Sequence, residues 1–194
     1  MRNINKENEK YSSRDENGMF HIYSVWKSML RRCKSNKNYL GCTVCDDWLD
    51  YQNFAEWYVN NDFYGLGYDL DKDILIKGNK IYSPSTCCLV PRVINQVFKN
   101  HVKPRKHMLP LGVSYNKRNA HKKYGASLSL YGKQKHLGYY KTPEEASAAY
   151  VEAKEAYVKE LAIEWKDKIE PRAFEALMTW TVYCLLYTSP SPRD

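Results

Sequence analysis

The stretch LGVSYNKRNAHKKYGASLSLYGKQKHLGYYKTPEEASAAY, residues 111–150, decides the fold. It contains short runs in which apolar and polar residues alternate, a pattern typical of β-strands. Gly132 provides the turn between the second and third runs. The sequence therefore predicts three consecutive strands, over 111–116, 123–131 and 134–140.

The strands are followed by a strong helix start. Thr142 can cap the helix, Pro143 suits its first turn, and Glu145 lies at the spacing that closes a capping box. One apolar face then follows at helical spacing, with three alanines that allow close packing on the sheet. This face comprises Ala146, Ala149, Tyr150, Ala153, Tyr157 and Leu161.

Strand alternation assigns the two faces of this sheet, because successive side chains point to opposite sides. We expect one face to pack under the helix, with Val113, Tyr115, Ala126, Leu128, Leu130, Leu137 and Tyr139. The opposite face is polar and without acidic residues, with Ser114, Asn116, Ser127, Ser129, Gln134 and His136. Such a surface can enter a DNA groove.

Charge is concentrated in the same region. The formal net charge of the chain is +8, and the segment from Lys99 to Lys141 has eleven Lys or Arg residues and no Asp or Glu. A one-sign block of this kind favours a polyanionic partner, and nucleic acid is the leading candidate. RNA is less favoured, because RNA-binding sheets display aromatic residues for stacking and here the tyrosines are expected mostly on the core face.

The motifs LGVSY (111–115), KYGASLS (123–129), LGYY (137–140) and TPEEASAAY (142–150) resemble the Apetala-2/ethylene-response-factor DNA-binding domain. The resemblance implies a three-stranded antiparallel sheet on one helix, with the sheet lying in the major groove of double-stranded DNA. Plant members have mostly Arg, Glu and Trp at the reading positions. The contacts that the resemblance implies here are Ser114, Asn116, Ser127, Ser129, Gln134 and His136. From the basic block we add Lys117, Arg118 and Lys123 to the expected DNA-binding residues, because basic side chains beside the sheet can meet phosphates.

The N-terminal part has a different pattern. Apolar periodicity predicts helices over 20–33 and 48–58, the second capped by Asp46 or Asp47. A strand over 70–76, a strand over 87–90 and a helix from Pro91 to Lys99 follow. This order resembles an HNH-like (ββα-metal) endonuclease region, which accompanies such DNA-binding domains in phage and bacterial homing-endonuclease-type proteins.

The resemblance places a catalytic centre at Asp71, Lys72, Asp73 and Asn95, with Asp71 and Asp73 as Mg²⁺ ligands. An HNH centre needs a histidine as general base, and the residue at that position is Lys72, whose ordinary pKa of about 10.4 makes it a poor base. We therefore expect a degenerate, binding module. The alternative is an active metal-dependent DNA endonuclease with a lysine-substituted centre.

Other sequence features limit the remaining classes. Cys42 and Cys45 have zinc-like spacing, but no second such pair exists, so we do not expect structural zinc. The longest apolar run is too short to span a membrane, and Met1–Asn17 lacks an apolar signal core. We expect a cytoplasmic protein of a bacterial or phage-infected host cell, with no small-molecule substrate. The sequence indicates no oligomeric state.

These observations predict an α+β chain with two modules and flanking segments. Residues 183–194 differ in composition from the segment before them, with two prolines and several small hydroxyl residues after an apolar cluster, and they look like a non-native tail. The predicted parts are a polar arm (1–18), a degenerate HNH-like module (19–99), a basic linker (100–110), an Apetala-2-like domain (111–168), a helical extension (169–182) and the tail.

Overall fold

The computed structural model describes residues 10–12, 21–98, 109–117 and 121–182. The predicted tail, Arg118 and most of the predicted arm and basic linker lie outside these residues. The chain divides into two compact units, one formed by 1–95 and 165–176 and the other by 96–164 and 177–194. Within the described ranges, no helix is long and apolar enough to cross a membrane.

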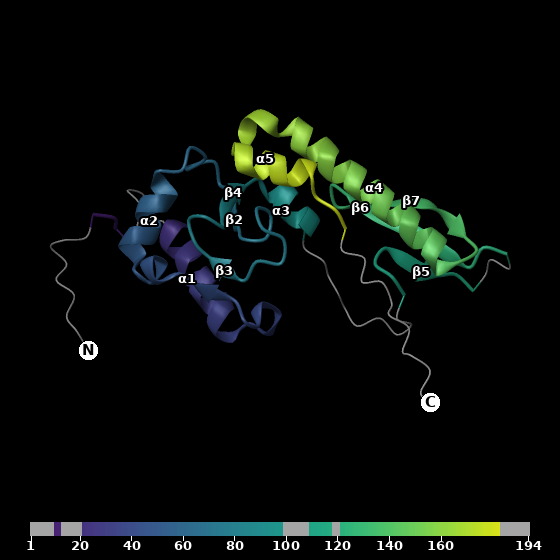
Figure 1. Cartoon of the computed structure of the whole chain (residues 1–194), viewed down its shortest axis with the longest axis horizontal. Coiled ribbons are helices and arrows are strands. Elements are labelled where there is room, and N and C mark those ends of the chain that lie inside the picture. Colours follow the sequence, from purple (N-terminus) through teal and green to yellow (C-terminus); the bar gives the residue numbers. More distant parts are fainter. Residues whose placement is uncertain (1–9, 13–20, 99–108, 118–120, 183–194) are drawn as a thin grey trace. The chain divides into compact units, whose positions relative to one another are not determined.

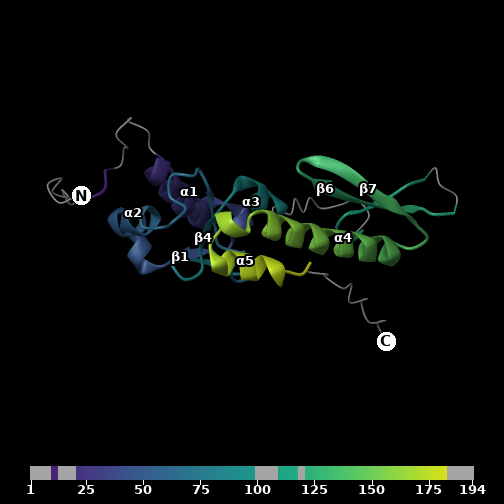
Figure 2. The ribbon, with the colours of Figure 1, turned by 90° about the horizontal axis from the view of Figure 1, so that it is seen from above.

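The second unit contains the predicted sheet and helix (Figure 1). Strands β5 (Val113–Tyr115), β6 (Tyr124–Leu130) and β7 (Lys133–Tyr140) form an antiparallel sheet in the order β5-β6-β7. Helix α4 (Pro143–Glu164) packs along one face of it, as Figure 2 shows from a second direction. The predicted α+β fold class and this arrangement are confirmed.

The capping box at the start of α4 is also confirmed. The backbone N–H of Glu145 donates to the Thr142 hydroxyl at 3.2 Å, and the Glu145 carboxylate accepts from the backbone N–H groups of Thr142 and Lys141. These contacts satisfy donors that the first turn of a helix leaves without partners. The helix therefore begins where the sequence predicts.

A close approach fixes the start of β5 against α4. Gly112 has a φ of +76°, and a Cβ atom there would overlap the ring of Tyr150 on α4. Val113, Ala126 and Ala146 form the buried centre of this contact, with Leu137 and Tyr140 packed beside it. The small side chains allow the helix and the sheet to lie close together.

One prediction for the sheet is wrong. Tyr139 was expected on the helix-facing side, but it is 42% exposed and points to the opposite face. The cause is a β-bulge in β7: Ala126 pairs with Gly138, whereas Ser127 pairs with His136, so Leu137 is an extra residue. The bulge shifts the alternation by one, which places Tyr140 in the core in place of Tyr139.

The first unit is built on two helices, α1 (His21–Ser35) and α2 (Tyr51–Val59), which pack around an aromatic core. The second helix begins later than predicted, because Asp46–Leu49 forms a short 3-10 helix. Its cap is Asp50, whose carboxylate accepts from the Gln52 backbone N–H. The core comprises Met29, Trp48, Phe54, Tyr58, Leu70, Tyr82, Cys87 and Leu89.

Two small sheets complete this unit. Strands β2 (Asp69–Asp71) and β4 (Cys88–Val90) pair antiparallel and precede helix α3 (Arg92–Phe98). A parallel pair, not predicted from the sequence, joins β1 (Thr43–Val44) to β3 (Ile81–Tyr82). The remaining helices are the 3-10 turns Lys37–Tyr39 and Lys166–Lys168, and α5 (Pro171–Met178).

Candidate nucleic-acid interface

The sheet face opposite α4 gathers the predicted DNA-contact residues. Residues directly opposite one another in an antiparallel sheet point to the same side, and the register pairs Ser114 with Gly125, Ser127 with His136, and Ser129 with Gln134. The backbone N–H of Asn116 donates to the Lys123 carbonyl at 2.7 Å and extends the pairing. We call this surface the outer face: Ser114, Asn116, Lys123, Gly125, Ser127, Ser129, Gln134, His136 and Tyr139.

The outer face is open to solvent. Six of its side chains are exposed, and those of Asn116 and Ser127 are half-buried; the exposed six are Ser114, Lys123, Ser129, Gln134, His136 and Tyr139. Lys117 follows Asn116 and is also exposed, whereas Arg118 lies outside the described residues. The structure thus brings every described member of the predicted contact set to one face or to its margin.

The lysines around this face are exposed to solvent. Six lysines of the basic block are described, and all are exposed: Lys117, Lys122, Lys123, Lys133, Lys135 and Lys141. Lys122 has an interaction with another part of the chain, and the other five form no ion pair with another described residue. The block contains no carboxylate, so every formal charge that it contributes to this surface is positive.

Tyr139 is a member of the outer face that strand alternation misses. Its ring packs on that of His136 with centroids 4.4 Å apart, and it lies across from Gly125 in the register. Gly138, with a φ of +149°, marks the irregular point in the strand. A glycine inside a strand pattern is a known indication of a bulge, and it was the available sequence signal.

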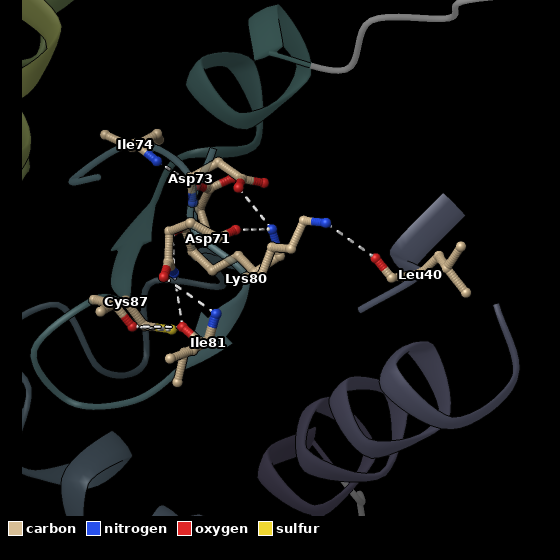
Figure 3. Close-up of polar contacts among 10 residues, drawn as sticks. Leu40, Asp71, Asp73, Ile74, Lys80, Ile81 and Cys87 are labelled. Atoms are coloured by element: carbon tan, nitrogen blue, oxygen red, sulfur yellow. Dashed lines mark hydrogen bonds and ion pairs between the residues drawn. The ribbon is translucent and has the colours of Figure 1, made fainter. Parts of the chain in front are cut away.

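The predicted catalytic carboxylate of Asp71 has a structural role in the first unit. Asp71 is buried, and its Oδ1 accepts hydrogen bonds from the backbone N–H groups of Asp73 at 2.7 Å and Ile74 at 2.8 Å (Figure 3). Burial raises the pKa of this carboxyl, although the two backbone donors act in the opposite direction. The same turn ends β2 at Asp71, well before the predicted strand end at residue 76.

Lys72 is held among fixed partners. Its ammonium donates to Oδ1 of Asp73 at 2.6 Å and to the backbone carbonyl of Asn79 at 2.8 Å. It also lies 5.9 Å from the ring centroids of both Tyr39 and Tyr82. The side chain is buried, so the loop between β2 and β3 folds around the ammonium group of Lys72 itself.

The remaining predicted catalytic residue points elsewhere. Asn95 on α3 donates through Nδ2 to Oδ2 of Asp69 at 2.8 Å, and among the described residues no hydrogen bond joins it to Asp71 or Asp73. One oxygen of Asp71 serves two backbone donors, and one oxygen of Asp73 already binds an ammonium. Each of these two carboxylates therefore has one oxygen already engaged within the loop.

The cysteines of this unit are mostly buried. Burial raises the pKa of the Cys87 thiol to about 12, which favours the protonated, unreactive form. Across the described ranges, no three His, Cys, Asp or Glu residues come together in a group that could hold a metal ion. Cys42 and Cys45 therefore stand without a third ligand in the described part of the chain.

Comparison of the chain with models of protein families, with curated proteins and with solved structures gave no match.

Proposed function

We propose that this protein binds double-stranded DNA by laying the outer face of its three-stranded sheet in the major groove. The observation that carries the proposal is the coincidence of shape and charge: an uncovered polar sheet face lies within a block that has exposed lysines and no carboxylate. The major groove admits a two-stranded β-ribbon, and β-sheet proteins are known to read DNA with strands placed in a groove. The motif resemblance to the Apetala-2/ethylene-response-factor domain supports the same docking mode.

The side chains divide into two roles. Lys117 and Lys123, at the turn between β5 and β6, would contact phosphates and supply most of the affinity without reading sequence. Asn116 and Gln134 have amides that can form two hydrogen bonds to adenine, whereas serine hydroxyls discriminate weakly. Arg118 belongs with the phosphate group by its position in the sequence.

The residues of the first unit support a protein that binds DNA without cleaving it. The position of the general base is occupied by Lys72, whose ammonium is held by Asp73 and Asn79. A nitrogen that already donates to two oxygens of the protein is not placed to take a proton from a water molecule. We therefore propose that the HNH-like part stabilises the protein or adds DNA contacts.

The salt dependence of binding tests the phosphate role. The full chain would be titrated with a fluorescent duplex at several salt concentrations, beside Lys123→Ala and the control Lys159→Ala, which removes an exposed lysine of α4. Loss of one phosphate contact should reduce the magnitude of the log–log slope by about 0.9 in the first variant only. Equal slopes for wild type and Lys123→Ala would remove this lysine from the interface.

Base reading requires a separate measurement. Gln134→Ala should change the preference among duplexes of different sequence more than it changes the mean affinity, because it removes a base contact and leaves the lysines in place. Uniform weakening across all sequences would show that this side chain does not read bases.

The absence of cleavage is tested with supercoiled plasmid and Mg²⁺. Wild-type protein should retard the plasmid without nicking it. Metal-dependent nicking that Asp71→Asn abolishes would contradict the binding-only proposal and support an active endonuclease.

A further inference from the structure

The environment of Tyr139 is specific enough to suggest what this residue recognises. Its ring extends over Gly125 on the neighbouring strand: a Cβ at Gly125 would lie 3.2 Å from Cε1 of Tyr139 and 3.2 Å from Oγ of Ser114. The ring therefore occupies the space that a side chain at position 125 would fill. His136 packs against it at an interplanar angle of 52°.

These contacts hold the ring in place while leaving much of it uncovered. Tyr139 is 42% exposed, although it touches Gly125 below and His136 at its side. A side chain that is already ordered loses little rotamer freedom when a partner binds. The bulge, the glycine opposite and the histidine beside it together present a fixed aromatic surface near the middle of the outer face.

This surface is chemically distinct from its neighbours. The other outer-face side chains are hydroxyls, amides, a lysine and an imidazole, so the tyrosine ring is the main apolar area among them. In the major groove, the C5-methyl group of thymine is the apolar group that base pairs display. An apolar surface that enters the groove gains free energy only where it covers such a group.

We propose that Tyr139 is a specificity-determining residue that selects thymine by covering its methyl group. The inference rests on the proposed docking of the outer face in duplex DNA. It adds a side chain that the family resemblance did not supply, and it predicts that the preferred site contains a thymine opposite the β6–β7 pair.

Stacking on an unpaired base is the other use that proteins make of an exposed sheet aromatic. The geometry favours the duplex, because single-strand binders stack successive bases on several rings and His136 already packs against the single tyrosine of this face. The same experiment distinguishes the two uses.

The experiment removes the methyl group alone. A preferred duplex would be selected from a random library with the full-length protein, and each thymine in it would then be replaced by uracil, one at a time. One position should lose about fourfold in affinity, the value for burying one methyl-sized group. In Tyr139→Ala, which lacks the ring, the same replacement should have no effect, whereas Tyr139→Phe should keep it.

Tyr115→Ala is the matched control. Tyr115 is 41% exposed in the same sheet, but by the register it belongs to the side of Val113 and Ala126. This variant should show the same thymine-to-uracil loss as wild type. Circular dichroism and thermal unfolding would establish that each variant is folded.

The outcomes separate this inference from the proposed function. If salt-dependent duplex binding persists but no uracil replacement matters, or if it matters equally in Tyr139→Ala, the thymine role is overturned and the docking proposal stands. If single-stranded oligothymidine binds more tightly than the duplex and Tyr139→Ala abolishes this, base stacking replaces both. If the protein binds no duplex at all, the proposed function itself fails.

Discussion

At the scale of single residues, Asp71 is a carboxylate that sequence patterns associate with catalysis but that accepts hydrogen bonds from the backbone in the structure. Its Oδ1 accepts two N–H groups in a buried turn. Asp71→Ala would leave both donors without a partner, and we expect a loss of about 2–3 kcal/mol in the free energy of unfolding by urea titration. Asp71→Asn keeps an oxygen at this position and should retain most of the stability.

The raised pKa of Asp71 adds a pH test to the same pair of variants. The pKa of this carboxyl is higher in the folded state than its unfolded value of 3.8, so the folded state holds the proton more tightly. As the pH rises from the unfolded pKa to the folded pKa, the free energy of unfolding therefore decreases. Wild type should lose stability relative to Asp71→Asn as the pH rises from about 4. A constant difference at all pH values would show that the burial of this charge has no cost.

Gly112 is a second residue whose substitution should strongly affect stability. Its φ of +76° and its position against the Tyr150 ring both exclude a side chain. We expect Gly112→Ala to lower the free energy of unfolding of the second unit by at least about 2 kcal/mol, because strain and overlap add. Gly132→Ala is the control, since its φ is +78° but no atom of the described residues lies within 4 Å of a Cβ there. Equal losses in both would mean that backbone strain accounts for the whole effect.

At the scale of elements, Lys154 links α4 to a backbone carbonyl within the second unit. Its buried ammonium donates to the Val97 carbonyl at 2.8 Å, and burial lowers its pKa to about 8. Because the folded pKa lies below the unfolded value of 10.5, the free energy of unfolding should rise as the pH increases from 8 towards 10.5.

Lys154→Met tests this link. Tyrosine and cysteine titrations are common to both proteins, so the difference between them isolates Lys154. Between pH 7.5 and 9.5, wild type should gain about 1 kcal/mol relative to the variant in urea titrations, a value that allows for partial solvent screening. If the two curves run parallel, the ammonium is not desolvated in the folded state.

The elements also show which structure could be predicted from the sequence. The capping box of Thr142 and Glu145 and the strand patterns are local signals, and they predict α4 and the three strands well. The side of the sheet on which Tyr139 lies depends on one extra residue in β7, and the alternation of apolar and polar residues does not reveal that residue. The β1–β3 pair joins segments far apart in sequence through two residues each, too short for any periodic pattern.

The candidate site divides in the same way. Its polar members follow from strand alternation on either side of the bulge, so Ser114, Ser127 and Gln134 were predictable. The engagement of Asp71 and Lys72 by Asp73, Ile74 and Asn79 depends on how one loop closes, and neither composition nor motif spacing contains that information. Motif resemblance therefore drew attention to these residues without indicating their contacts.

At the scale of the whole molecule, the central question is whether DNA is attracted by net charge or bound by one face. The chain is basic overall, and the excess charge lies in the block from Lys99 to Lys141. A generally basic protein binds DNA weakly through many orientations, whereas a docked face loses affinity only when that face is changed. The two cases differ in their response to one added negative charge.

The most direct measurement compares two variants with the same net charge. Ser129→Glu places a carboxylate on the outer face, and Ala148→Glu places one on an exposed position of α4. The affinity of each for a fluorescent duplex would be measured at one fixed salt concentration. Docking of the outer face predicts a loss of about tenfold or more for Ser129→Glu and less than about twofold for Ala148→Glu, because only the first carboxylate meets the phosphates and base edges at close range. Equal losses in the two variants would contradict the assignment of the outer face as the DNA-binding surface.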